Sequence, residues 1–374
     1  MTHRENALAV LNYEKYDKMP IVSFGYWHET LDKWAGEGHI TEEEAGDYRI
    51  NGDNGPADRS VMKKLGFDFN WNSCIGAKAD LFPQFEEKVL EERPDGSKVM
   101  RDSMGLIVSI KPLTVSIPGE IGTCLTGRDA WEKDYLPRMK WSDKRVDFDG
   151  LKDFMTVEGR EIPVGIHCGS LMGTMRNLLG VEEFSYLYVD DEGLFIEIAG
   201  TFSELSHKSV KTMLESGAKF DYAHYWEDIC FKNGPLISPA VFDKIVGPHY
   251  KKTTDLLKSY GINIVSLDCD GLIDLLIPTW IHNGVNTMFP IEVGTWGANI
   301  APWREKYGRE LRGVGGMNKT VFAHDYAAVD AEIERLKPLI SLGGYIPCPD
   351  HRIAPDAKFE NVQYYCGRIR ELSL

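Results

Sequence analysis

The feature that most constrains the fold is a regular alternation of short apolar segments with longer amphipathic ones along the second half of the chain. The short segments are typical of buried strands, and the longer ones have the 3.6-residue periodicity of helices. Strands that alternate with helices are parallel and are joined by right-handed crossovers. Strands are expected at 162–168, 220–226, 262–270, 285–292, 311–317 and 345–348, and helices at 184–216, 239–260, 272–283, 302–309, 326–342 and 361–372.

Two earlier segments, 20–24 and 67–72, bring the expected strands to about eight. The sequence therefore predicts an α/β fold, a (β/α)8 TIM barrel that forms a single domain over residues 1–374. Such a barrel needs about 250 residues, which leaves room for an insertion. We expect a β-rich insertion at 83–140, where KVLEERPDGSKVMRD has a Pro-Asp-Gly turn between alternating segments. A doubly wound open sheet is the alternative, but no GxGxxG turn follows the first strand.

Charge and cysteine usage narrow the range of partners. The net charge of −15 argues against nucleic acid or an anionic membrane surface as the main partner. The amino-terminal segment has no signal-peptide layout, and no apolar run approaches the ~18 residues of a membrane span. We therefore expect a cytoplasmic protein. The seven cysteines are scattered without a CxxC motif, so neither disulfides nor a cysteine-rich zinc site is expected.

Two carboxylates follow the apolar strand INIVSLDCDG. Side chains alternate between the two faces of a strand, so Asp268 and Asp270 lie on the same side as Ser266. A buried pair of carboxylates is costly unless a cation or a shared proton accompanies it. Because catalytic residues of TIM barrels lie at the carboxyl ends of the strands, this pair predicts an active site.

Other polar side chains follow other expected strands. Each also has an ordinary structural explanation, such as a helix cap, a buried histidine with a satisfied hydrogen bond or a loop residue. Trp226 and Trp296 could line a pocket or belong to the core. Zinc accepts histidine nitrogen and carboxylate oxygen, so ligands from several strands could meet at one ion. The further candidates are Tyr26, His28, His167, His224, Glu227, Glu292, Asp350 and His351.

Several stretches of the chain resemble the uroporphyrinogen decarboxylase superfamily. The opening NALAVLNYEKYDKMPIV is similar to the amino-terminal helix and first strand of that family. The resemblance implies a (β/α)8 barrel, often a homodimer, and one of two chemistries: cofactor-free decarboxylation of uroporphyrinogen, or zinc-dependent methyl transfer involving a corrinoid protein or a thiol. The main resembling stretches are WEDICFKNGPLISPAVFDKIVGPHYK, VSLDCDGLIDLLIPTWIHNGVNTMFPIEVG, LRGVGGMNKT and GGYIPCPDHRIAPDAKFENVQYY.

Two departures from the family pattern decide between these chemistries. The decarboxylases carry an arginine-rich opening after the first strand, whereas this chain reads SFGYWHETLDKW, without an arginine to hold substrate carboxylates. The methyltransferases carry a His-x-Cys motif and a distant cysteine as zinc ligands. The resemblance places Asp268, Asp270 and His351 at these three positions. This oxygen-rich set suits a Lewis acid that acts on an oxygen atom.

The resemblance therefore implies a zinc-dependent methyltransferase. It would move a methyl group from a methoxylated, preferably aromatic compound to the Co(I) of a separate corrinoid protein. Zinc would be held by Asp268, Asp270 and His351, and the catalytic residues would be Asp268, Asp270, Glu292 and His167. A cofactor-free decarboxylase and a non-catalytic binding barrel remain alternatives. The substrate pocket would comprise Tyr26, His28, Trp226, Glu227 and Trp296.

Overall fold

A parallel sheet forms the centre of the computed structural model, which describes residues 1–111 and 114–372. Neighbouring strands are all parallel, as the strand–helix alternation predicts. Along the sheet the order is β15-β14-β13-β12-β9-β8-β3. The strands are β3 (Cys74–Gly76), β8 (Gly165–His167), β9 (Tyr222–Trp226), β12 (Val265–Asp268), β13 (Thr287–Phe289), β14 (Arg312–Met317) and β15 (Tyr345–Pro349).

Two short strands lie at the open side of this sheet. β1 (Val22–Ser23) pairs in parallel with β2 (Phe69–Asn70), and β2 leads directly into β3. On the other side, Tyr26 forms a parallel bridge with Ile353, just beyond β15. The amide of Ile353 donates to the Gly25 carbonyl at 3.0 Å. If β2 and β3 are taken as one strand interrupted at residues 71–73, the barrel has eight strands, and this arrangement is consistent with the predicted (β/α)8 fold.

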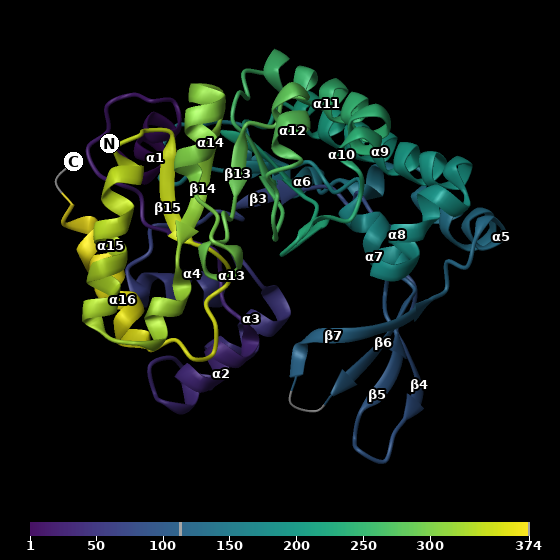
Figure 1. Cartoon of the computed structure of the whole chain (residues 1–374), viewed down its shortest axis with the longest axis horizontal. Helices are drawn as coiled ribbons and strands as arrows, with labels where there is room; N and C mark the ends of the chain where they lie inside the picture. Colours follow the sequence, from purple (N-terminus) through teal and green to yellow (C-terminus); the bar gives the residue numbers. More distant parts are fainter. Residues whose placement is uncertain (112–113, 373–374) are drawn as a thin grey trace.

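The helices cover the outside of the strands (Figure 1). Sequence signals mark several of their ends: Thr2 and Thr41 form capping boxes with Glu5 and Glu44, and Gly66 ends its helix with φ of 95°. The α-helices are α1 (His3–Leu11), α2 (His28–Gly36), α3 (Glu42–Asn51), α4 (Pro56–Leu65), α5 (Arg128–Ala130), α6 (Phe148–Leu151), α7 (Gly173–Leu179), α8 (Val181–Asp190), α9 (Glu192–Glu215), α10 (Pro239–Val241), α11 (Gly247–Ser259), α12 (Ile277–His282), α13 (Val293–Trp296), α14 (Ile300–Tyr307), α15 (Tyr326–Ile340) and α16 (Phe359–Arg370).

Two helix predictions are corrected. The expected helix 184–216 is divided into α8 and α9 at Asp191, whose carboxylate accepts a hydrogen bond from Leu194 N and caps α9. The expected helix 272–283 begins later, at Ile277. The preceding residues form a turn in which Leu272 N donates to the carbonyl of Phe231. A local side-chain cap therefore divides the first helix. A backbone hydrogen bond to the distant strand β10 (Cys230–Phe231) delays the second, and apolar periodicity alone shows neither contact.

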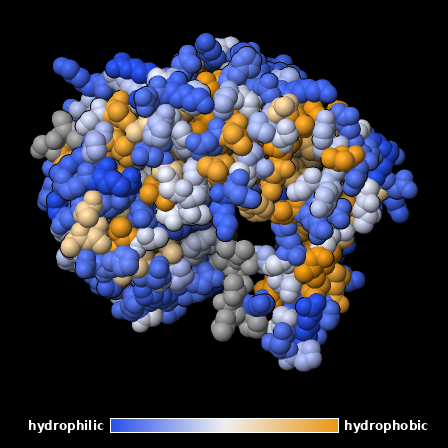
Figure 2. Space-filling view, viewed as in Figure 1, coloured by the Kyte–Doolittle hydropathy of each residue, from blue (hydrophilic) through white to orange (hydrophobic). Residues whose placement is uncertain are grey.

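A four-stranded antiparallel sheet lies within residues 83–140 and projects away from the barrel (Figure 1). At its first turn Arg93 N donates to Ser97 O, and Gly96 has φ of 79°. Figure 2 shows a deep indentation between this sheet and the rest of the molecule. The strands are β4 (Lys88–Glu92), β5 (Lys98–Arg101), β6 (Leu106–Lys111) and β7 (Thr114–Thr123); a short separate hairpin is formed by β10 (Cys230–Phe231) and β11 (Gly234–Pro235).

All seven cysteines are free thiols. No helix in the described part of the chain has both the length and the apolar character needed to cross a membrane.

Candidate functional site at the carboxyl ends of the strands

A cavity of about 930 Å³ opens at the carboxyl ends of the barrel strands. One wall comes from the barrel, where Trp226, Asp268 and His351 follow or end three different strands. The opposite wall comes from the inserted sheet, which contributes Met104 and Val108 among others. The cavity therefore lies where TIM barrels place their active sites, and the inserted sheet covers part of it.

Three carboxylates meet on the barrel wall. Asp228, Asp268 and Asp270 each offer an oxygen, and the three oxygens lie within 4.8 Å of one another. Asp268 ends β12 and is buried, with 6% of its surface exposed. The backbone amide of Asp270 donates to Asp228 Oδ1 at 3.0 Å, which fixes the two loops relative to each other. Three like charges at this separation repel one another strongly unless a cation or protons are present.

The surroundings favour protonation of this group. Burial, followed by the charges of Asp228 and Asp270, raises the pKa of Asp268 well above its usual value. Burial and the neighbouring Asp270 raise the pKa of Asp228 to about 6. Asp270 Oδ1 is buried and has no hydrogen-bond partner among the described residues. These features are those expected of a site that gains stability when it binds a cation.

His351 is attached to one of the three carboxylates. Its Nε2 lies 2.9 Å from Asp270 Oδ2, and its Nδ1 is buried without a partner in the part of the chain described. The imidazole stacks on Trp27, with ring centroids 5.3 Å apart and an interplanar angle of 23°. Among the three carboxylates, His351 therefore forms a hydrogen bond only with Asp270. The third residue of the group of possible metal ligands is Asp228 and not His351.

Two further histidines, His167 and His224, line the same cavity side by side from the paired strands β8 and β9. His167 Nδ1 accepts a hydrogen bond from Gly169 N at 3.0 Å, so its proton resides on Nε2. Burial lowers the pKa of His167 to about 4, and burial together with His167 lowers the pKa of His224 to about 3. Both imidazoles are therefore neutral near pH 7 and can donate a hydrogen bond to a bound ligand.

Glu292 lies behind the group of three carboxylates and does not line the cavity. It accepts hydrogen bonds from Gly271 N at 2.6 Å and from Thr295 Oγ1 at 3.1 Å. Burial, and then the charge of Asp270, raises its pKa. Asp350 has a similar structural role, since it accepts from the amides of Gly294 and Lys319. Both carboxylates hold the loops that carry the site.

Four other predicted pocket residues also lie off the cavity wall. Glu227 is fully buried and accepts hydrogen bonds from the amides of residues 171, 172 and 173 and from Ser170 and Tyr250, which anchors the start of α7. Trp296 packs against Trp303 instead. Tyr26 and His28 line an adjoining cavity of about 530 Å³, which shares Trp27 and Arg352 with the main one.

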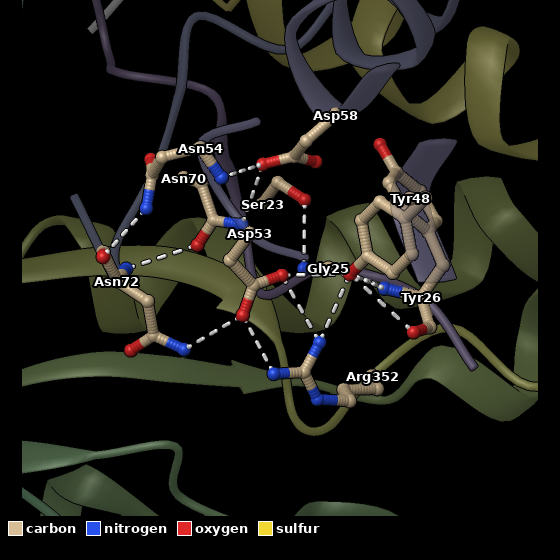
Figure 3. A network of polar contacts seen from close by, with 10 residues as sticks. All are labelled: Ser23, Gly25, Tyr26, Tyr48, Asp53, Asn54, Asp58, Asn70, Asn72 and Arg352. Carbon is tan, nitrogen blue, oxygen red and sulfur yellow. Dashed lines mark hydrogen bonds and ion pairs between the residues drawn. The ribbon is translucent and has the colours of Figure 1, made fainter. Parts of the chain in front are cut away.

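A polar network closes the barrel beside this cavity (Figure 3). The guanidinium of Arg352, one residue after His351, forms an ion pair with Asp53 at 2.6 Å and also donates to Tyr48 Oη at 3.0 Å. Tyr48 Oη donates to Asp53 Oδ1 at 2.7 Å. The loop after β15 is thereby fastened to α3 and to the loop that follows it, which restricts the position of His351.

Asp228 is the site residue that the sequence interpretation missed. The strand Tyr222–Trp226 was expected to contribute Glu227, which immediately follows it. The period of two from His224 through Trp226 reaches Asp228, two positions further on, and this spacing was the available signal. The alternation does not by itself fix the direction of this side chain, because the strand ends at Trp226 and Asp228 has φ of 45°.

The donor set fits a divalent metal ion. Three carboxylate oxygens come within reach of one point, and no hydrogen bond from another described residue reaches the side chain of Asp268. Carboxylates are ligands for zinc and also suit harder ions such as magnesium and manganese. A bound cation would replace the protons that this group otherwise retains.

Comparison with known proteins finds a solved structure with the same fold. No protein-family profile and no curated protein matches the sequence. Among solved structures, a methyltransferase from Methanosarcina mazei superposes with a TM-score of 0.60 over 99% of each chain, at 16% identity. The chain shares its fold with that methyltransferase.

Two methionine synthases are more distant. A B12-independent methionine synthase from Shewanella sp. W3-18-1 gives a TM-score of 0.49 at 11% identity, and a putative one from Listeria monocytogenes gives 0.42 at 12%. Each alignment covers 95% of this chain and 98% of the other chain.

Proposed function

We propose that this protein is a metal-dependent methyltransferase. It would take a methyl group from a methoxylated, preferably aromatic compound and pass it to Co(I) of a separate corrinoid protein. The observation that supports the proposal most is the group of three carboxylates, Asp228, Asp268 and Asp270, beside a cavity of about 930 Å³ at the strand ends. The fold shared with a methyltransferase and the resemblance in sequence agree with it.

Zinc is the ion we propose, held by these three carboxylates, with His351 orienting Asp270 through the 2.9 Å contact. A bound ion there would act as a Lewis acid and stabilise the negative charge that develops on the ether oxygen. Because the donor set is rich in oxygen, manganese or magnesium would also fit, and metal analysis of the purified protein distinguishes these ions.

The residues of the chain would bind the substrate and exclude water. Trp27 and Trp226 offer flat apolar surfaces to an aromatic ring. His167 is neutral and donates from Nε2, so it can bind an oxygen of the substrate but cannot supply a proton as a strong acid at pH 7. Positioning and charge stabilisation would therefore be the protein's main contribution to the rate.

The proposed step is a displacement at the methyl carbon. The bond between the methyl carbon and the ether oxygen would break with its electron pair left on oxygen. The methyl group would pass to Co(I) of the corrinoid protein, which would become methyl-Co(III). The products are the methylated corrinoid and a phenolate or alkoxide. Co(I) persists only under reducing conditions, so we place the reaction in the cytoplasm, where free thiols also persist. Since the corrinoid must approach the methyl group, the open side of the cavity would receive the corrinoid protein.

Decarboxylation of uroporphyrinogen fits the cavity less well. Its wall carries more acidic than basic side chains, and Arg352 is already paired with Asp53. A substrate with eight carboxylates needs several free cations. We expect no coproporphyrinogen after incubation with uroporphyrinogen, and measurable turnover would contradict the methyltransferase proposal. Stoichiometric metal in the purified protein would argue against a non-catalytic binding barrel.

The test is an anaerobic mixture of the protein, a reduced corrinoid protein and a methoxylated aromatic compound. Absorbance should show conversion of Co(I) to methyl-Co(III), and omission of either protein should leave the compound unchanged. The Asp268→Asn variant should lose the signal, whereas Asp149→Asn, an exposed pair with Lys152, should retain it. If a broad panel of aryl and alkyl methyl donors and corrinoid proteins gives no methyl-cobalt signal, the proposal fails.

A further inference from the structure

An arginine from α7, Arg176, lines the same cavity close to the three carboxylates. Its Nη1 donates to the backbone carbonyl of Asp228 at 2.7 Å, and its Nη2 donates to Asn177 Oδ1 at 3.1 Å. The guanidinium carbon lies 5.6 Å from the centroid of the Trp226 ring. These contacts hold the guanidinium in one position at the cavity wall.

Arg176 forms no direct ion pair, although its charge opposes the rise in the pKa of the neighbouring Asp228. Within the described residues, no carboxylate oxygen lies within the 4 Å that defines an ion pair, and Nε is buried without a hydrogen-bond partner. A guanidinium has five N–H donors, and two hydrogen bonds occupy only part of them. By contrast, Arg352, the other arginine on the cavity wall, is paired with Asp53.

The surroundings of Arg176 offer space for a ligand. Asn177 and Trp226 line both the 930 Å³ cavity and a neighbouring one of about 710 Å³ that runs beneath residues 78–84. Arg176 itself lines the larger cavity, next to Asn177 and over the ring of Trp226. A ligand that extended from the three carboxylates along the face of Trp226 would reach the guanidinium.

Arg176 could instead serve only to balance the negative charge of the three carboxylates, but this role explains its contacts less well. The hydrogen bond from Arg176 goes to the carbonyl of Asp228 and not to its carboxylate, although that carboxylate is nearby. Unused donors in a partly buried position cost free energy that a bound anion would recover. A planar guanidinium with free donors matches a carboxylate in two parallel hydrogen bonds.

We propose, on the basis of the proposed function, that the methoxylated substrate carries a carboxylate and that Arg176 binds it. The methoxy group would lie at the three carboxylates and the aromatic ring against Trp226. The acidic wall would repel this anion everywhere except at Arg176 and at a bound metal ion. Arg176 is then the residue that selects carboxylated over neutral methoxy compounds.

The test is calorimetric titration of the protein with 3-methoxybenzoate, benzoate and anisole, which needs no corrinoid. The wild type should bind both carboxylates at least ~10-fold more tightly than anisole. Arg176→Gln should lose that preference and leave anisole binding unchanged. Arg176→Lys should be intermediate, because it keeps the charge and loses the paired geometry. The control is Arg368→Gln, an arginine on α16 that does not line either cavity.

Titration in chelator-treated protein separates this site from the metal. Benzoate affinity that vanishes on chelation but is unchanged in Arg176→Gln would overturn the proposal, as would a wild type without preference for the carboxylates. Circular dichroism shows whether each variant is folded. The comparison of the three ligands with the wild-type protein remains a test even if a variant does not fold. If carboxylate selectivity is found but no methyl transfer, only the proposed function fails. If methyl transfer occurs equally well from neutral donors, only the role of Arg176 fails.

Discussion

His351 Nε2 lies 2.9 Å from Asp270 Oδ2, so one imidazole holds one of the three carboxylates in place. Nothing in the spacing of the two residues, 81 positions apart, requires this contact. It follows from the closure of the barrel, which brings the loops after β12 and β15 to the same end.

This contact predicts different effects for the two residues on metal binding. Asp270→Ala removes a ligand and should abolish stoichiometric zinc. His351→Ala removes the group that orients the ligand and should weaken zinc binding about 10- to 100-fold. Competition with a chromophoric chelator measures both affinities. Stoichiometric zinc retained by both variants would refute the assignment of the site.

The raised pKa of Asp228 predicts how stability and metal binding depend on pH. Below about pH 4 this carboxyl group is protonated in both the folded and the unfolded protein. Between pH 4 and pH 6 only the folded protein keeps the proton, so the contribution of Asp228 to stability falls as the pH rises. Metal binding requires the deprotonated form and therefore strengthens over the same range.

The rise in melting temperature on adding zinc should accordingly be larger at pH 7.5 than at pH 5. In metal-free protein, Asp228→Asn should raise the melting temperature at pH 7.5 and have little effect at pH 4. Differential scanning calorimetry measures both quantities. The opposite dependence, with more stabilisation by zinc at pH 5, is incompatible with this account.

Gly25 is required where the polar network of Figure 3 closes the barrel. Its φ is 83°, and an added Cβ would lie 2.5 Å from Asp53 Oδ1 and 2.6 Å from Arg352 Nη1. Gly25→Ala should therefore disrupt the ion pair as well as strain the backbone. Gly38→Ala is the matched control, because Gly38 has nearly the same φ of 82° and no atom within 4 Å of the added Cβ.

Urea unfolding should show a loss of roughly 1 kcal/mol for Gly38→Ala, from backbone strain alone. The loss for Gly25→Ala should exceed it by about 2 kcal/mol or more, since a partly buried ion pair must also move. Equal losses in the two variants would show that the network does not hold the loop after β15.

Glu227 anchors α7 through its five hydrogen bonds. In Glu227→Gln an NH₂ group replaces one carboxylate oxygen and cannot accept the hydrogen bonds that this oxygen accepts. The variant should therefore be less stable by about 2 kcal/mol or more. Glu204→Gln, which alters an exposed pair with Lys252, should cost less than about 1 kcal/mol. Thermal unfolding compares the two variants, and similar small losses would mean that Glu227 does not support the helix that carries Arg176.

The fold could be predicted because its signal is periodic and local. Apolar strands that alternate with helices require parallel pairing, and that requirement leaves few arrangements. The break at Asp191 could not be predicted from periodicity, since the apolar pattern continues across it and one side-chain hydrogen bond decides the boundary.

The site is less accessible from sequence, because its details depend on contacts between distant loops. Alternation along β12 places Asp268 on the side of Ser266, and in the structure Ser266 accepts a hydrogen bond from Trp71 Nε1 inside the barrel. The hydrogen bond from Gly271 N to Glu292 joins residues 21 positions apart, and the bond from Ser170 to Glu227 joins residues 57 positions apart. Contacts between distant residues leave no periodic pattern in a sequence. The sequence therefore does not show that the carboxylates of Glu292 and Glu227 support loops.

The most direct test of the account is the dependence of methyl transfer on metal. The rate of methyl-Co(III) formation from a methoxylated aromatic donor is measured anaerobically with chelator-treated protein, before and after one equivalent of zinc is added. We predict no methyl-cobalt signal before the addition and a restored rate after it, with no restoration in Asp268→Asn. A full rate in the metal-free protein, equal in the wild type and in Asp268→Asn, would contradict the role given to the three carboxylates.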